Sequence, residues 1–185
     1  MKKNNTYDLL IVGAGPIGMT CAIAAQKAGL KYIVIEKGVL VNSLYHFPTN
    51  MTFFSTSKKL EIGEVPFISH NEKPTRREAL EYFRRVNDAW QLNINFYEKV
   101  LNINQVENNS YQIETDKTTY QSHSVAVVTG FYDIPRLLNI PGEDLSKVKH
   151  YYDDWHPYIG QKVAVVGAAN SSCDVALELS TKVLM

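Results

Sequence analysis

The sequence predicts an α/β protein with a Rossmann-like three-layer fold, an antiparallel β excursion, and the start of a second Rossmann-like domain. A short apolar segment at residues 7–12 leads directly into the glycine pattern G-x-G-x-x-G at 13–18, and an amphipathic helix follows. A second apolar segment lies at residues 31–35, as expected for the next strand of a parallel βαβ unit. Near the end of the chain, residues 162–172 repeat the order of strand, turn and helix start. These observations together predict the fold class.

The opening glycine turn has the residues that a dinucleotide pyrophosphate needs. Gly13 permits the tight turn, Gly15 lets the backbone approach the ligand, and Gly18 lets the helix lie close to the strand. Pro16 suits the first helical turn, where its missing N–H would have no partner. The free amides and the positive end of the helix dipole should therefore face an anion.

Glu36 ends the second predicted strand and follows Gly18 at close to the spacing of about 20 residues expected for a ribose-binding carboxylate. A carboxylate there accepts hydrogen bonds from ribose hydroxyls and repels a 2′-phosphate. This first site is therefore predicted to hold FAD or NAD rather than NADP. The alternative is an ordinary βαβ unit with a solvent-facing glutamate.

The composition is that of a globular protein without net charge. The chain has 185 residues, of which 45% are hydrophobic and 21% charged, and its 19 basic residues balance 19 acidic ones. Neither a nucleic acid nor a membrane is expected as partner. No apolar run reaches the roughly 20 residues of a membrane span, and no signal peptide is expected before the first strand, so we expect a cytoplasmic protein. Cys21 and Cys173 form neither a zinc motif nor a disulfide framework, and Cys21 is expected to be buried.

The middle of the chain is predicted to contain one long irregular segment and one helix. Residues 42–57 are rich in aromatics and have no periodicity, so they are expected to pack against a flat, partly polar group such as an isoalloxazine ring, or to cover a hydrophobic cluster. Thr75 and Glu78 form a capping box for a helix over 76–92. The arginines of this helix are predicted to form a solvated face: Arg76, Arg77, Arg84 and Arg85.

The rest of the chain is predicted to complete one domain and begin another. The remaining strands are expected at 93–97, 100–106, 111–115 and 124–130, with a hairpin turn at 107–110. We expect the first domain at 1–130, a linker at 131–160 and the truncated start of the second domain at 161–185. His150 and His156 lie in that linker without a metal-ligand spacing, so no metal site is expected.

The second glycine turn is a weaker signal than the first. Its pattern, G-x-A-x-x-S, keeps only the first glycine, Gly167. A strand is predicted at 162–166, and the turn and helix start that follow it, up to Ser172, lead into a helix that continues over 174–184. Fewer residues remain than the roughly 30 that a complete βαβ unit needs.

Several segments resemble one family. Residues 42–45, 48–57, 73–76, 129–135 and 139–143 are similar to the bacillithiol-disulfide reductase family of thioredoxin-reductase-like flavoproteins, which bind FAD and use NADPH. The resemblance covers essentially all of the chain and corresponds to the N-terminal portion of that family.

The resemblance implies two cofactor sites. For FAD it implies that the pyrophosphate lies at Gly13, Gly15, Pro16 and Gly18. It implies that the adenosine ribose lies at Glu36 and Lys37 and the adenine at the Val100 backbone. The flavin would lie near the loop from Asn50 to Thr56, and Thr129 and Gly130 would close the site. For NADPH it implies Gly167, Ala169, Asn170 and Ser171.

The resemblance also implies hydride transfer from NADPH to the flavin, and then reduction of a small-molecule disulfide such as bacillithiol disulfide. It allows a homo-oligomer. However, residues 150–160 contain no C-x-x-C pair, and Ile17 stands where one branch of the family has a cysteine. No catalytic residue is therefore predicted. Two alternatives remain: a non-catalytic FAD-binding fragment, and a flavin monooxygenase or ferredoxin-type reductase on the same scaffold.

Overall fold

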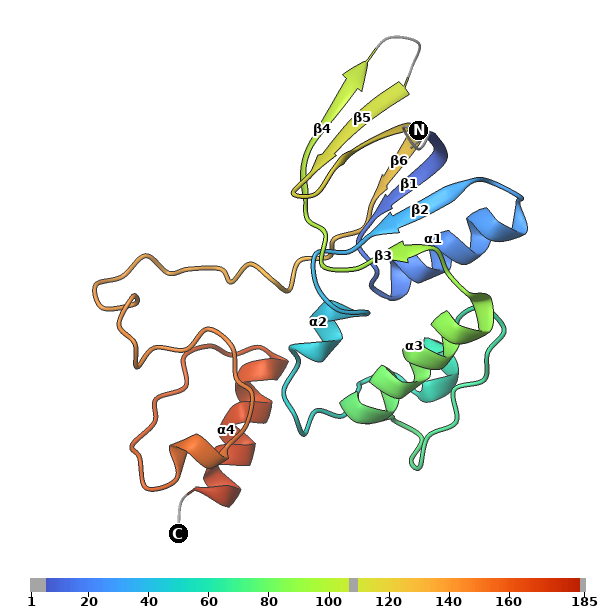
Figure 1. Cartoon of the computed structure of the whole chain (residues 1–185). Coiled ribbons are helices and arrows are strands. Elements are labelled where there is room, and N and C mark those ends of the chain that lie inside the picture. The colour runs from blue at the N-terminus through green and yellow to red at the C-terminus, as the bar shows by residue number, and fades with distance from the viewer. Residues whose placement is uncertain (1–5, 107–109, 184–185) are drawn as a thin grey trace. The chain divides into compact units, whose positions relative to one another are not determined.

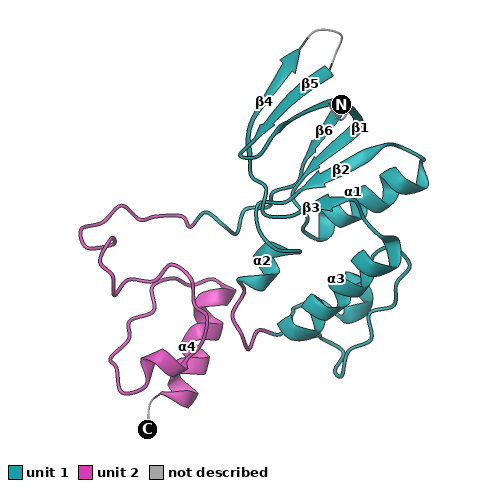
Figure 2. Ribbon diagram, in the orientation of Figure 1, with its two compact units in different colours: residues 1–46, 52–134 teal, residues 47–51, 135–185 magenta. Residues whose placement is uncertain are grey.

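The computed structural model describes residues 6–106 and 110–183. It separates into two compact units (Figure 2). Unit 1 comprises residues 1–46 and 52–134, and unit 2 comprises residues 47–51 and 135–185.

Unit 1 is built on one six-stranded sheet with the strand order β3-β2-β1-β6-β5-β4 (Figure 1). The strands are β1 (Thr6–Val12), β2 (Tyr32–Ile35), β3 (Ile94–Asn95), β4 (Val100–Val106), β5 (Ser110–Thr115) and β6 (Thr119–Val127). β1 pairs in parallel with β2 and β6, and β2 pairs in parallel with β3. β5 pairs antiparallel with both β4 and β6. The predicted Rossmann-like fold with an antiparallel excursion is thus confirmed. Of the predicted hairpin turn at 107–110, residues 107–109 lie outside the described residues and Ser110 begins β5.

The register brings the ends of three parallel strands to one edge of the sheet. Val12 at the end of β1 lies opposite Ile35 of β2 and Val127 of β6. Residues 10–12 of β1 and all of β2 are buried, because a strand in the middle of a parallel sheet is covered on both faces.

Two helices have the start signals that the sequence predicts. α1 (Pro16–Lys27) begins with Pro16 in its first turn, and it packs so closely that a Cβ on Gly18 would lie 1.9 Å from the carbonyl oxygen of Gly13. α3 (Arg76–Trp90) begins at the predicted capping box. The Thr75 side chain accepts from the Glu78 N–H, and the Glu78 carboxylate accepts from the Thr75 N–H at 2.8 Å.

The antiparallel strands complete a hydrophobic cluster on the sheet. Ile113 of β5 and Tyr120 of β6 pack with alternate buried residues of the parallel strands, namely Leu10, Val12, Ile33 and Ile35. The excursion therefore contributes to the core of unit 1.

The irregular segment at 42–57 has more local order than the sequence predicts. It contains the one-turn helix α2 (Asn42–Tyr45), and Thr52 forms an isolated antiparallel bridge with Thr75. The short 3-10 helix η1 (Ser57–Leu60) follows. Single helical turns are too short to produce a detectable hydrophobic period.

In unit 2 the predicted strand at 162–166 is wrong, because no strand is assigned anywhere from 161 to 168. A strand needs a neighbour for its backbone hydrogen bonds, and the described residues of unit 2 contain no strand that could pair with it. Unit 2 instead contains the 3-10 helix η2 (His156–Tyr158) and α4 (Asn170–Lys182). The start of α4 lies within the stretch 162–172 where the helix start is predicted. In the described part of the chain, no helix combines the length and apolarity needed to cross a membrane.

Candidate functional site

The opening glycine turn lies at the edge where the parallel strands end. Gly13 donates its N–H to the carbonyl of Ile35 at 2.8 Å, and Val128 donates to the carbonyl of Val12 at 2.9 Å. Gly13 has a φ of 109°, and a Cβ there would lie 2.8 Å from the carbonyl oxygen of Val128. The turn thus follows the end of β1, which pairs with β2 on one side and β6 on the other. Open α/β sheets bind ligands at such a position.

Gly15 leaves an open space at the start of α1. An added Cβ at Gly15 would meet no atom within 4 Å, and its φ of −72° is one that any residue adopts. No side chain of the described residues caps α1. The first-turn amides and the positive end of the helix dipole are therefore available to an anion.

Glu36 connects the end of β2 to the glycine turn. Its side chain is only 5% exposed, and its two carboxylate oxygens accept hydrogen bonds from the N–H groups of Ala14 at 2.7 Å and Gly38 at 2.8 Å. The solvent-facing alternative is therefore wrong. Each carboxylate oxygen has a second lone pair, so the group can accept further hydrogen bonds.

Lys37 has a partner that the sequence analysis missed. Its Nζ lies 2.5 Å from an oxygen of Asp133, and the two side chains are 48% and 22% exposed. The neighbouring Tyr132 donates its hydroxyl to the carbonyl of His46 at 3.3 Å. Nothing in the spacing of these residues signals the pairing, because it joins the end of β2 to a segment that follows β6.

Three further residues assigned to the first site come from two places. Val100 begins β4 opposite Thr115. Thr129 and Gly130 follow β6, and Gly130 has a φ of 68° with open space around its added Cβ.

The predicted flavin loop is divided between the two units. Thr56 belongs to unit 1, where it precedes η1. Asn50 belongs to unit 2, where its side-chain amide donates to Glu178 at 3.0 Å. The structure therefore does not bring these two residues together in one unit.

The second glycine turn lies at the start of α4 in unit 2. Gly167 has a φ of 135°, and a Cβ there would meet the Ser172 hydroxyl at 2.5 Å. Ala169 is the N-cap residue, and Asn170 and Ser171 begin the helix. Within the described residues no side chain caps this helix either.

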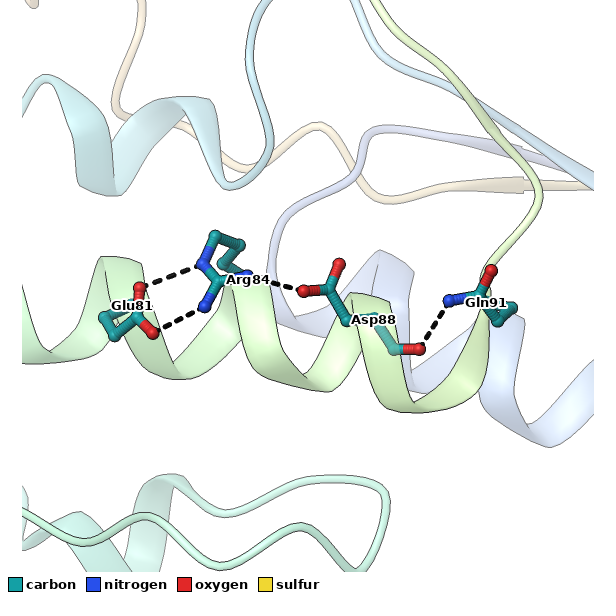
Figure 3. A network of polar contacts seen from close by, with 4 residues as sticks. All are labelled: Glu81, Arg84, Asp88 and Gln91. Carbon is teal, nitrogen blue, oxygen red and sulfur yellow. Dashed lines mark hydrogen bonds and ion pairs between the residues drawn. The ribbon is translucent and has the colours of Figure 1, made fainter.

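Arg84 and Arg76 of α3 lie in different surroundings. Arg84 bonds to Glu81 and Asp88 on the exposed face of the helix (Figure 3), as the solvated-face interpretation predicts. Arg76 differs, because its guanidinium donates to the carbonyls of Leu44 and Tyr45 at the end of α2. The interpretation is therefore wrong for Arg76, which links two helices.

A buried polar cluster lies at the junction of β3 and β4, and the sequence analysis missed it. The Glu98 side chain is 3% exposed and bonds to Asn95, Thr115 and Tyr120. Burial, and then the hydrogen bond to Glu98, raise the pKa of Tyr120 to about 12.

Both cysteines are free thiols. Cys21 on α1 is only half-buried, which differs from its predicted interior position, and Cys173 on α4 is exposed. Among residues 6–106 and 110–183, no group of three or more His, Cys, Asp or Glu side chains is arranged to hold a metal.

The parallel strands, the glycine turn and the acid at the end of β2 together define a Rossmann-like α/β protein. Residues 10–183 match the pyridine nucleotide-disulphide oxidoreductase family. The chain belongs to this family.

Individual relatives support the same assignment. The bacilliredoxin reductase Bdr of Bacillus subtilis is 47% identical over 92% of this chain. The solved structure of the bacillithiol disulfide reductase Bdr (YpdA) from Staphylococcus aureus is 42% identical, covers 96% of this chain and has a TM-score of 0.93. A ferredoxin–NADP reductase of Ligilactobacillus salivarius is 31% identical over 98% of this chain. The chain covers 52%, 55% and 51% of these three proteins, so it spans about half of their length.

Proposed function

We propose that unit 1 binds FAD with its diphosphate at the start of α1. The observation that carries the proposal is the open space at Gly15, next to a turn that Gly13 and Gly18 fit tightly. The space allows a ligand to approach the backbone, whereas the other two glycines are required by the fold. The residues present therefore fit the group.

The residues around the turn have separate roles in this proposal. The first-turn amides of α1, with Gly15, Pro16 and Gly18, hold the diphosphate. Glu36 accepts hydrogen bonds from the adenosine ribose, and Lys37 lies beside it.

The remaining contacts of the FAD site are proposed on the family resemblance. The Val100 backbone contacts the adenine. The loop that begins at Asn50 and ends at Thr56 lies near the flavin, and Thr129 and Gly130 close the site.

We propose a second site, for NADPH, at the start of α4. Gly167, Ala169, Asn170 and Ser171 would hold its diphosphate, because the uncapped helix start presents free amides. This corresponds to an FAD-binding domain at 1–130, a linker at 131–160 and the start of an NADPH-binding domain at 161–185.

For the whole protein we propose NADPH-dependent reduction of a small-molecule disulfide, with bacillithiol disulfide as the candidate substrate. The named activity of the Staphylococcus aureus relative supports this. Bound FAD supplies the hydride acceptor and electron donor, while this chain supplies binding and orientation. We propose a cytoplasmic location and allow a homo-oligomer.

The test is to purify the 185-residue chain, add FAD, and record the flavin absorbance after gel filtration. Retained FAD supports the first site, and its absence contradicts it. Bleaching of the bound flavin by NADPH supports the second site. Disulfide reduction is then measured with the protein extended to the length of its relatives.

A second candidate is a ferredoxin-type reductase. The Ligilactobacillus salivarius relative carries that name, and this chain has no C-x-x-C pair. NADPH-dependent reduction of ferredoxin, without reduction of bacillithiol disulfide, would favour it. Oxygen consumption would favour a flavin monooxygenase, and FAD that NADPH fails to bleach would favour a non-catalytic binding fragment.

A further inference from the structure

Glu98 is a buried carboxylate to which the proposed function gives no role. Three neutral side chains surround its carboxylate. The Tyr120 hydroxyl lies 3.0 Å from Oε1, the Thr115 hydroxyl 2.6 Å from Oε1, and the Asn95 side-chain amide 3.1 Å from Oε2. A carboxylate with 3% exposure is unfavourable unless it is hydrogen-bonded, so these partners hold Glu98 in one position.

The partners of Glu98 come from different strands of unit 1. Asn95 ends β3, Thr115 ends β5 and Tyr120 lies in β6. Asn95 also donates to the Tyr120 hydroxyl at 2.9 Å. Glu98 thus connects the last parallel strand to the antiparallel strands.

The backbone beside Glu98 reaches the proposed ribose site. The Glu98 N–H donates to the carbonyl of Glu36 at 2.9 Å, and the Tyr97 N–H donates to the carbonyl of Gly38 at 3.2 Å. Tyr97 has a φ of 54°, a left-handed conformation that is unfavourable for tyrosine. Its side chain is 64% exposed, so the anchored neighbour Glu98, rather than burial of the Tyr97 ring, holds this backbone.

We propose that Glu98 is a positioning residue for the ribose of the bound dinucleotide. It does not touch the ligand. It fixes the backbone of residues 97–98, which donates hydrogen bonds to the carbonyls of Glu36 and Gly38. The position of this backbone in turn determines the position of the Glu36 carboxylate, which accepts hydrogen bonds from the Ala14 and Gly38 amides. The inference rests on the proposed function, since it requires a dinucleotide at the opening turn.

The experiment compares binding of ADP and 2′,3′-dideoxy-ADP to the 185-residue chain by calorimetry, with FAD as a reference ligand. The unmodified chain should bind ADP about tenfold more tightly than the dideoxy compound, because a charged acceptor for a ribose hydroxyl contributes about that much. Glu98→Leu should lower the affinity for ADP about tenfold and leave the affinity for the dideoxy compound unchanged. The preference for the ribose hydroxyls should therefore disappear.

Two control variants separate positioning from general stability. Glu98→Gln keeps the side-chain shape and one acceptor oxygen. The Asn95 amide can turn its oxygen toward the NH2 group that this substitution introduces. Most of the preference for ADP over the dideoxy compound should therefore remain. Ile113→Val removes a methyl group from the buried core of β5. It should lower the melting temperature and leave the ribose preference intact. If Glu98→Leu does not fold, Tyr120→Phe replaces it, because it removes one donor to Glu98 and should reduce the preference in part.

The possible outcomes separate a failure of this inference from a failure of the proposed function on which it rests. An intact ribose preference in folded Glu98→Leu or Tyr120→Phe would overturn the inference, as would an equal loss in Ile113→Val. If the unmodified chain binds ADP and its dideoxy analogue alike, the FAD site survives and the inference fails. If it binds neither FAD nor ADP, the proposed function fails and the inference fails with it.

Discussion

Gly15 and Gly18 stand three positions apart and have different physical reasons to be glycine. A Cβ on Gly18 would collide with the backbone of Gly13, so the fold requires that glycine. A Cβ on Gly15 would point into open space, and its backbone angles suit any residue. The fold itself therefore does not require a glycine at position 15, and the proposed diphosphate site gives a reason for one.

Gly15→Val should abolish FAD retention and leave the melting temperature of the ligand-free chain nearly unchanged. The valine side chain would occupy the path of the diphosphate without touching the protein. Flavin absorbance after gel filtration and thermal unfolding without ligand measure the two effects. Gly18→Ala is the matched control and should lower the melting temperature. Unchanged flavin absorbance in Gly15→Val would contradict the assignment of this turn.

Tyr120 should make the protein less stable in alkali. Burial and Glu98 raise its pKa from 10.0 to about 12, so the folded protein holds the phenolic proton more tightly than the unfolded chain does. This contribution is fully present below pH 10 and is lost as the pH rises through about 12.

Tyr120→Phe should accordingly make the alkaline decline in the free energy of unfolding shallower. Urea unfolding at several pH values between about 9 and about 12 measures this. Tyr97→Phe, at a side chain that is 64% exposed, serves as the control. An equally steep decline in Tyr120→Phe and in the unmodified chain would contradict the explanation.

Among the elements, α3 shows how a local signal defines a helix start. Two side chains within one turn satisfy its first amides, and both are present in the sequence at the expected spacing. Hydrogen bonds from the backbone of His70, and then of Thr75, lower the pKa of Glu78.

Thr75→Ala should destabilise the protein by about 1 kcal/mol, because an N-cap side chain is lost. Urea unfolding near neutral pH measures this change. Glu78→Gln should also destabilise the protein near neutral pH. Its difference from the unmodified chain should shrink as the pH falls below 4.5, because the lowered pKa contributes stability only while the carboxylate is charged. A difference that persists in acid would contradict this account.

The sequence predicted the elements whose causes are local. The first βαβ unit, the proline at the start of α1 and the capping box each depend on neighbouring residues, and all are confirmed. The prediction of a strand at 162–166 was wrong because hydrogen bonding to another strand decides whether such a segment forms a strand. The Glu98 cluster could not be predicted, since Asn95 and Tyr120 lie 25 positions apart and meet only in the folded sheet. In the candidate site, the spacing indicated Glu36 but gave no sign of its two amide partners or of the pairing of Lys37 with Asp133.

At the scale of the whole molecule, unit 2 exposes much apolar surface. Val166 is 78% exposed and Leu177 is 67% exposed. A cavity of about 270 Å³ is open between the 161–165 segment and α4, and apolar side chains line most of it: Val163, Val165, Ala176, Leu179 and Val183. Exposed apolar surface of this kind promotes association.

The 185-residue chain should therefore associate in solution, and Leu177→Lys should increase its monomeric fraction. Gel filtration with light scattering measures the fraction. Thr181→Lys adds the same charge to the same helix without removing an apolar side chain, so it should have a smaller effect. A sharp monomeric peak and cooperative melting of the unmodified chain would contradict this expectation.

The five residues from 47 to 51 belong to unit 2, although the chain on both sides of them belongs to unit 1. The Thr49 N–H donates to the carbonyl of Asp153 at 2.8 Å, and Asn50 bonds to Glu178. The polypeptide therefore crosses between the units three times, at 46–47, 51–52 and 134–135. Unit 2 therefore contains two separate stretches of the chain, so a substitution within residues 47–51 acts on the unit that carries the second glycine turn.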